Sequence, residues 1–193
     1  MDQKWRVASS KPLLNDRWIN LRADCCVTAS GIEIDPYYVL DYPDWVNIVA
    51  VTREDSLVLV RQYRHAAGDF ILEVPGGIVD GPDSNVELTA RRELEEETGY
   101  VAARWQLVSA LYADPAKQTN RVHVFLARDA QCIKPQLLDA GEEGLTVRVV
   151  PIPEVLDGLS SGLLGMSMHV SSVLLGLAAA GRLQLKTGIA KVT

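Results

Sequence analysis

Three glutamates near the middle of the chain, Glu93, Glu96 and Glu97, have a spacing that suggests chemistry. In a helix, at about 100° per residue, Glu93 and Glu97 fall in the same angular sector as an apolar stripe. Glu96 lies beside them on the next turn, so the three carboxylates converge. Like charges this close repel each other unless a cation lies among them. The apolar stripe consists of Val86, Ala90 and Leu94.

A charge run of this kind is most often a solvated helix face with local ion pairs, here to Arg91 and Arg92. Two features favour a ligand site instead. The acids share the sector of the core residues, and the Gly76-Gly77 turn, which lets backbone carbonyls approach a ligand, precedes the helix. Carboxylate and carbonyl oxygens suit Mg²⁺, with Mn²⁺ as an alternative, better than zinc. Such an ion would neutralise a diphosphate and polarise a water for attack on phosphorus.

The helix that carries these acids has recognisable ends. Ser84 and Glu87 match a capping box, with Ser84 as the N-cap. Gly99 suits the left-handed position just beyond the last turn. Before the helix, the polar loop 80–83 interrupts a series of strand-like segments.

Eight segments have the composition of strands and are separated by turn signals. Ser30-Gly31 can close a hairpin between the first two, and residues 53–55 form a short polar connection between the next two. This order favours an antiparallel or mixed sheet over repeated βαβ units. The predicted strands are 18–28, 37–41, 46–52, 56–63, 70–74, 105–112, 121–127 and 145–150.

Two helices are predicted towards the end of the chain, the first beginning near Pro153. The uncharged stretch 158–181 is long enough to span a bilayer, but its serines and glycines make it more polar than a typical spanning helix. We therefore expect a helix of a soluble protein and no membrane partner. Its expected core face consists of Val170, Val173, Leu174 and Ala178, and its expected outer face of Ser167, Ser171 and Ser172.

The composition of the 193 residues, 48% hydrophobic and 23% charged, excludes a disordered or low-complexity chain. The net charge of −6 argues against nucleic acid as a partner. The three cysteines show no ligand spacing, and Cys25 and Cys26 would point to opposite faces of a strand, which makes a disulfide framework improbable. These features, with no signal peptide expected at the N-terminus, favour the cytoplasm.

The segment 77–100 resembles the Nudix box, G-x5-E-x7-R-E-U-x-E-E-x-G-U, in which U is aliphatic or aromatic. Its second half, from Arg92 to Tyr100, matches every fixed position, and so long a pattern is highly specific. The first half is one residue longer than in the family, so the family's first glutamate falls on Ser84, or on Asp83 if an insertion is allowed. In the family that glutamate mainly braces the box arginine, so the departure concerns the loop geometry more than metal binding.

The resemblance covers roughly residues 5 to 180 by element order. The segments RQYR (61–64) and LEVPGG (72–77) are similar to the region before the box in ADP-ribose and ADP-sugar pyrophosphatases, and Pro115 lies where that branch carries proline. A loop proline also has an ordinary turn explanation. The resemblance implies a Nudix α/β/α sandwich around a mixed sheet, formed by residues 45–193. It also implies an N-terminal β-rich extension, residues 1–44, that serves homodimerisation and base binding.

Carried over residue by residue, the resemblance places the family's metal shell on Glu93, Glu96, Glu97 and the backbone carbonyl of Gly76. Glu96 and Glu97 are then also catalytic residues. The loop 141–144 lies where this branch supplies a further glutamate that orients or deprotonates the attacking water. Glu143 is preferred to Glu142 for its distance from the following strand end, and an ordinary polar turn is the alternative.

For the substrate, the branch stacks its base on aromatic residues of the extension, and Trp18 with Tyr37 or Tyr38 match them here. Strand packing is the competing explanation for these aromatics. Arg64 is a candidate phosphate ligand, or else one half of a surface ion pair. The histidines are scattered, and no catalytic role is expected for His65, His123 or His169.

The activity that the resemblance implies is metal-dependent hydrolysis of a nucleoside diphosphate sugar to a nucleoside monophosphate and a sugar phosphate. ADP-ribose or an ADP-sugar is the leading candidate substrate. One alternative is another substrate, such as GDP-mannose, UDP-glucose or a nucleoside triphosphate, which Pro115 disfavours. The other is a non-catalytic nucleotide-sensing module. Nudix-type regulators usually add a winged-helix DNA-binding part, and the roughly 40 residues after Val150 leave little room for one.

Overall fold

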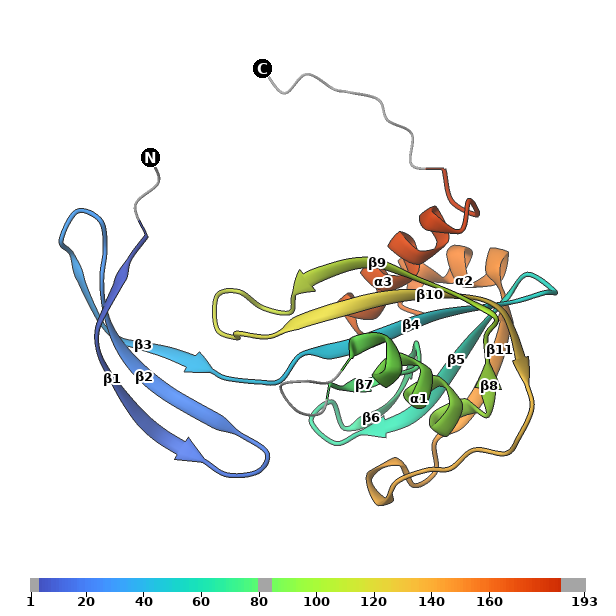
Figure 1. Ribbon diagram of the computed structural model, residues 1–193, viewed down its shortest axis with the longest axis horizontal. Helices are drawn as coiled ribbons and strands as arrows, with labels where there is room; N and C mark the ends of the chain where they lie inside the picture. Colours follow the sequence, from blue (N-terminus) through green and yellow to red (C-terminus); the bar gives the residue numbers. More distant parts are fainter. Residues whose placement is uncertain (1–3, 80–84, 185–193) are drawn as a thin grey trace. The chain divides into compact units, whose positions relative to one another are not determined.

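The computed structural model describes residues 4–79 and 85–184, and the chain divides into two compact units (Figure 1). The first comprises Met1–Asp44 and Leu111–Val122, and the second comprises Trp45–Ala110 and His123–Thr193. The first boundary lies at the junction of the extension and the domain named above. The return of the 111–122 segment to the first unit is not predicted from the sequence, because a local pattern does not show which distant strands a loop contacts.

The first unit is built on a three-stranded antiparallel sheet in the order β1 (Arg6–Asn15), β2 (Asn20–Val27) and β3 (Glu33–Leu40). The expected turn joins β2 to β3, and Gly31 adopts a φ of 88° within it. β1 is not predicted from the sequence. All of its residues are exposed, so it lacks the alternation of apolar and polar residues that marks a half-buried strand.

The second unit is built on an eight-stranded mixed sheet whose main path runs β11-β5-β4-β10-β8, with β6, β7 and β9 attached at its sides. Every strand predicted for this part of the chain is present, although β10 continues to Cys132. β7 and β8 are too short to produce a sequence pattern. The strands are β4 (Trp45–Thr52), β5 (Ser56–Arg64), β6 (Asp69–Glu73), β7 (Gly76–Ile78), β8 (Tyr100–Val101), β9 (Arg104–Tyr112), β10 (Arg121–Cys132) and β11 (Thr146–Pro151).

Helices lie on both faces of this sheet. Ile48 of the central strand β4 belongs to the same buried cluster as Leu94 of α1. On the other face α3 comes so close that a Cβ on Gly176 would lie 2.6 Å from Val49. Because successive strand residues point to opposite faces, α1 and α3 form separate layers, and the expected α/β/α sandwich is confirmed. The helices are α1 (Val86–Thr98), α2 (Ile152–Gly158) and α3 (Ser167–Ala179), with short 3-10 turns η1 (Ala140–Glu142) and η2 (Leu159–Ser161).

Only one of the two predicted ends of α1, the C-terminal one, agrees with the structure. Gly99 ends the helix in the left-handed conformation, with a φ of 73°, as expected. The N-cap is Asn85, whose side-chain oxygen accepts a hydrogen bond from the Glu87 N–H at 2.9 Å. Asn85 therefore replaces the expected cap, while Ser84, Asp83 and the rest of the loop 80–84 lie outside the described residues.

The last helix, α3, is present, but its buried face differs from the expected one. Ser172, expected to face outward, is 1% exposed, and its hydroxyl accepts a hydrogen bond from Asn47 Nδ2 at 3.0 Å. The polar partner on β4 makes this burial possible, and helical periodicity alone does not reveal it. The buried residues of α3 are His169, Ser172, Val173, Gly176 and Leu177. In the described part of the chain, no helix has the length and apolar character needed to cross a membrane.

Candidate active site

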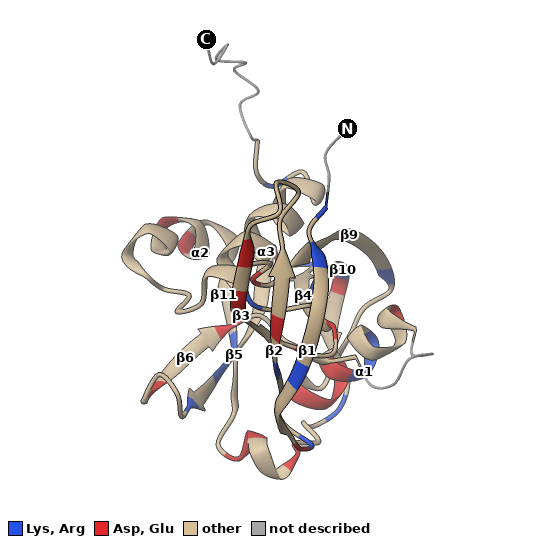
Figure 2. Ribbon diagram, turned by 90° about the vertical axis from the view of Figure 1, so that its left-hand side faces the viewer, with Lys and Arg blue, Asp and Glu red and all other residues tan. Residues whose placement is uncertain are grey.

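Helix α1 turns two carboxylates towards the interior of the second unit. Glu93 is 8% exposed and Glu97 is 2% exposed, and both share the helix face that buries Leu94. Glu96, one residue before Glu97, is partly exposed, and acidic residues colour much of this helix in Figure 2. A buried charge costs free energy unless it is paired or bound to a cation. The structure thus places Glu93 and Glu97 on the buried face of α1, as the helical spacing predicts.

Glu97 is anchored to the glycine turn. Its Oε2 accepts a hydrogen bond from the Gly76 N–H at 2.9 Å. Burial raises the pKa of Glu97 well above its usual value, the bond from Gly76 opposes this shift, and the charge of Glu93 adds to it. The carboxylate therefore lies in a place where a positive charge would be strongly favoured.

Glu93 lies against Gly77, the next residue of the same turn. A Cβ built on Gly77 would lie 2.4 Å from the carboxyl carbon of Glu93, so only glycine leaves room for this carboxylate. Burial raises the pKa of Glu93, and the charge of Arg92 opposes the shift. The glycine turn thus contacts both buried acids.

Arg92 pairs with two of the acids. Its guanidinium group donates to Glu93 Oε1 and to Glu96 Oε2, each at 2.7 Å. In the described residues, the ligand atoms of the three α1 carboxylates do not all lie within 4.8 Å of one another, and Arg92 pairs with two of these carboxylates. The positive charge of Arg92 thus partly neutralises Glu93 and Glu96.

The 3-10 turn η1 supplies a further carboxylate. The charge of Glu142 contributes to the raised pKa of both Glu93 and Glu97. Glu143 is exposed, and among the described residues it is not one of the principal charges that shift these two pKa values. Glu142 Oε2 also accepts a hydrogen bond from the Asp139 N–H at 2.8 Å. The electrostatics therefore favour Glu142 as the loop residue that faces the acids, while the spacing in the sequence favours Glu143.

Arg64 lies in a network that the sequence only partly reveals. Its Nε and Nη2 donate to the Glu73 carboxylate at 2.9 and 2.5 Å, and Gln62 Nε2 donates to the same group at 3.4 Å. Glu73 is 1% exposed, and the Arg64 charge also lowers the pKa of Glu97. Sequence reasoning missed Glu73. The available signal was an acid in a strand directly before the Pro75-Gly76 turn.

The residues expected to bind the nucleoside lie in the first unit. Trp18 is 67% exposed in the turn between β1 and β2, with the preceding arginine stacked on its ring. The Tyr37 hydroxyl donates to the Ala116 carbonyl at 2.6 Å, which places this tyrosine beside the loop that contains Pro115. Tyr38, on the alternate face of β3, is exposed. Tyr37 and Pro115 are therefore brought together within this unit.

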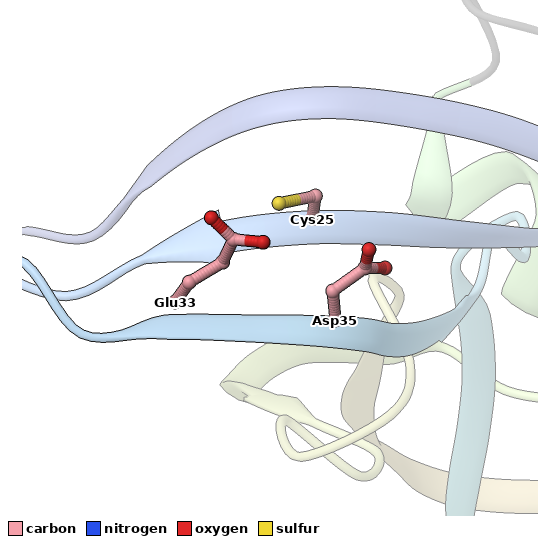
Figure 3. Close-up of side chains that lie close together, drawn as sticks. All are labelled: Cys25, Glu33 and Asp35. Carbon is pink, nitrogen blue, oxygen red and sulfur yellow. The ribbon is translucent and has the colours of Figure 1, made fainter.

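A second group of potential metal ligands also lies in the first unit: Cys25, Glu33 and Asp35, with ligand atoms within 4.8 Å of one another (Figure 3). Desolvation and the charges of the two acids raise the pKa of the Cys25 thiol. Cys26, on the opposite face of β2, is buried, as the alternation predicts. Cys25, Cys26 and Cys132 are all free thiols.

The α1 residues fit a divalent cation better than the cysteine group does. Two buried carboxylates with raised pKa values lie beside a turn whose glycines leave room for them. Hard oxygen donors of this kind suit Mg²⁺ or Mn²⁺. Glu93, Glu96, Glu97 and the Gly76 carbonyl are the groups that would hold the ion.

Comparisons with known proteins show which families and proteins this chain resembles. The model described as the NUDIX domain matches residues 41–165, and the model described as the nucleoside diphosphate sugar hydrolase N-terminal domain matches residues 5–40. An ADP-ribose pyrophosphatase of Bacillus subtilis is 33% identical over 61% of this chain and 63% of its own length. One of Mycobacterium tuberculosis is 31% identical over 90% and 83%. A solved structure titled as an ADP compounds hydrolase matches with a TM-score of 0.79 at 23% identity, over 94% of this chain and 98% of its own.

Proposed function

The chain belongs to the Nudix family. We propose that it hydrolyses the diphosphate of a nucleoside diphosphate sugar, and that its preferred substrate is ADP-ribose or an ADP-sugar. The products are a nucleoside monophosphate and a sugar phosphate. The observation that carries the proposal is the pair of buried carboxylates, Glu93 and Glu97, held against the Gly76-Gly77 turn. The names of the two pyrophosphatase relatives support the substrate class.

Mg²⁺, with Mn²⁺ as the alternative, is the proposed cofactor. When bound, it neutralises diphosphate charge and activates water for attack on phosphorus. Glu93, Glu96, Glu97 and the Gly76 carbonyl are the proposed ligands, and Glu96 and Glu97 also serve as catalytic groups. The burial of Glu93 and Glu97 on helix α1 positions both carboxylates before the substrate arrives, and such positioning contributes much of the rate in phosphoryl transfer.

Two further groups of the second unit act on the diphosphate. Arg64 directs two of its N–H donors to Glu73, and the exposed remainder of its guanidinium group is free to meet phosphate oxygens in the geometry that arginine favours. A glutamate of the loop 141–144 takes the proton of the attacking water. Glu143 is the residue that the resemblance favours for this step, and Glu142 is its competitor on electrostatic grounds.

The first unit binds the nucleoside and builds a homodimer in this proposal. Trp18, with Tyr37 or Tyr38, stacks on the base, and Pro115 marks the branch that handles ADP-ribose. The match of residues 5–40 to a nucleoside diphosphate sugar hydrolase N-terminal model supports this assignment. The free thiols of all three cysteines support a cytoplasmic location.

The test is product analysis after parallel incubation of the purified protein and Mg²⁺ with ADP-ribose, GDP-mannose, UDP-glucose and a nucleoside triphosphate. AMP and ribose 5-phosphate from ADP-ribose are the expected products. Preference for another substrate would refute the ADP-ribose assignment and retain the hydrolytic chemistry. If the folded, metal-loaded protein turns over none of them, the nucleotide-sensing alternative replaces the proposal.

A further inference from the structure

One buried histidine is not used by the proposed chemistry. His169, in the first turn of α3, is 5% exposed, and its Nδ1 accepts a hydrogen bond from the Val74 N–H at 3.0 Å. Because Nδ1 accepts, the ring is neutral and carries its proton on Nε2. Burial lowers its pKa to about 4, the charge of Glu73 opposes the shift, and that of Arg64 adds to it. The ring therefore remains an acceptor at neutral pH.

The bond from Val74 lies next to the glycine turn. Pro75 follows and has no N–H, so the next backbone donor is Gly76, which binds Glu97 Oε2 at 2.9 Å. Val74 is 1% exposed, so water cannot readily replace the histidine as the acceptor of its N–H. The strand side of the turn is anchored separately, because the Ile48 N–H donates to the Pro75 carbonyl at 2.8 Å. His169 thus provides the second anchor immediately before the proposed metal centre.

We propose that His169 is a positioning residue: its neutral Nδ1 fixes the Val74 N–H and thereby holds the Gly76 backbone against Glu97. The catalytic meaning of this inference rests on the proposed function, but its structural claim concerns the metal centre alone. Disturbing the Val74 anchor would let the turn move, and the Gly76 N–H and carbonyl would move with it. Glu97 would then lose its hydrogen bond, and the ion would lose a preformed ligand.

A change at His169 is expected to leave α3 in place. The helix is docked on β4 by the close approach of Gly176 to Val49 and by the hydrogen bond between Asn47 and Ser172. These contacts lie one and two turns further along the helix. A variant can therefore test the acceptor at position 169 without removing the layer that carries it.

Two matched variants separate the acceptor from the packing. In H169N the side-chain oxygen lies near the place of Nδ1 and can accept from Val74. In H169Q the amide lies near the place of Nε2, beyond reach of that N–H, while the side chain stays polar and of similar bulk. Mn²⁺ binding followed by electron paramagnetic resonance, and amide hydrogen exchange at Val74 and Gly76, are measured on the full chain without substrate.

We expect H169Q to bind Mn²⁺ about tenfold more weakly than the wild type, the effect of one lost buried hydrogen bond. Exchange at both amides should accelerate in H169Q, while H169N stays near the wild type in both measurements. Wild-type values in a folded H169Q variant would overturn the proposal. Equal losses in both variants would also overturn it, because packing and not the acceptor would then matter. If the wild type binds Mn²⁺ but hydrolyses no substrate, the proposed function fails while this inference is still decided by the same two measurements. If the wild type binds no Mn²⁺, the inference fails with the metal centre.

Discussion

Replacing Gly77 by alanine should damage the candidate active site and spare the fold. The added Cβ would lie 2.4 Å from both the carboxyl carbon and Oε1 of Glu93, and 2.8 Å from Oε2. These atoms form the far end of a flexible side chain, so the carboxylate can retreat. Gly77 does not have a positive φ, and alanine therefore fits its backbone.

The size of the effect follows from the distances. Ordinary contact begins near 3.4 Å, so the Glu93 carboxylate must move by about 1 Å, and a misplacement of about 1 Å in a catalytic site costs about 100-fold in rate. The free energy of unfolding should change by less than about 1 kcal/mol, because alanine also restricts the unfolded chain. We therefore expect kcat for ADP-ribose to fall about 100-fold at a nearly constant melting temperature.

The assay is steady-state hydrolysis of ADP-ribose over a range of Mg²⁺ concentrations, with thermal unfolding of each variant measured in parallel. Gly165→Ala is the matched control, because the three atoms nearest to its Cβ all belong to Ile71, and the two closest, Cγ2 at 2.7 Å and Cδ1 at 3.0 Å, are the outer atoms of that side chain. It should retain wild-type kcat. A Gly77→Ala variant with wild-type kcat and Mg²⁺ dependence would refute the assignment of Glu93 to the metal centre.

Three further predictions concern Glu97, the general base and the binding of the nucleobase. E97Q should abolish metal-dependent turnover. Without metal, the pKa of Glu97 is higher in the folded protein than in the unfolded chain. The Glu97 side chain therefore makes its full contribution to stability below its pKa in the unfolded chain, and this contribution is lost as the pH rises through its pKa in the folded protein. Metal-free E97Q should therefore melt above the metal-free wild type at pH 8, with a smaller difference towards pH 4, as calorimetry can show; equal melting temperatures at pH 8 would contradict the buried charge. Of E142Q and E143Q, the variant that removes the general base should lose about 100- to 10,000-fold in kcat, and equal, small losses in rapid-quench assays would exclude both. W18A should raise KM for ADP-ribose more than KM for UDP-glucose, and an unchanged KM ratio would argue against base stacking.

Much of the secondary structure of the second unit could be predicted, because helix faces and helix ends depend on residues that are close together in the sequence. Helical periodicity alone placed Glu93 and Glu97 on the buried face of α1, since 3.6 residues per turn determine which side chains share a face. Gly99 marked the end of that helix because a left-handed residue is needed there. The same reasoning misplaced the start of α1 at Ser84, because Asn85 is an equally good cap one residue later.

Only the tertiary structure decided which distant groups meet these acids. The sequence placed three glutamates on one helix, but the pairing of Arg64 with Glu73 and the bond from Gly76 to Glu97 join separate elements. The sequence gives His169 no recognisable role, because its partner is a backbone N–H far away along the chain. Such contacts depend on how strands and helices pack, and a pattern of neighbouring residues does not encode the partner that packing supplies. The sequence by itself therefore determined the acids and the helix that carries them, while packing determined their burial, their raised pKa values and the groups that hold them in place.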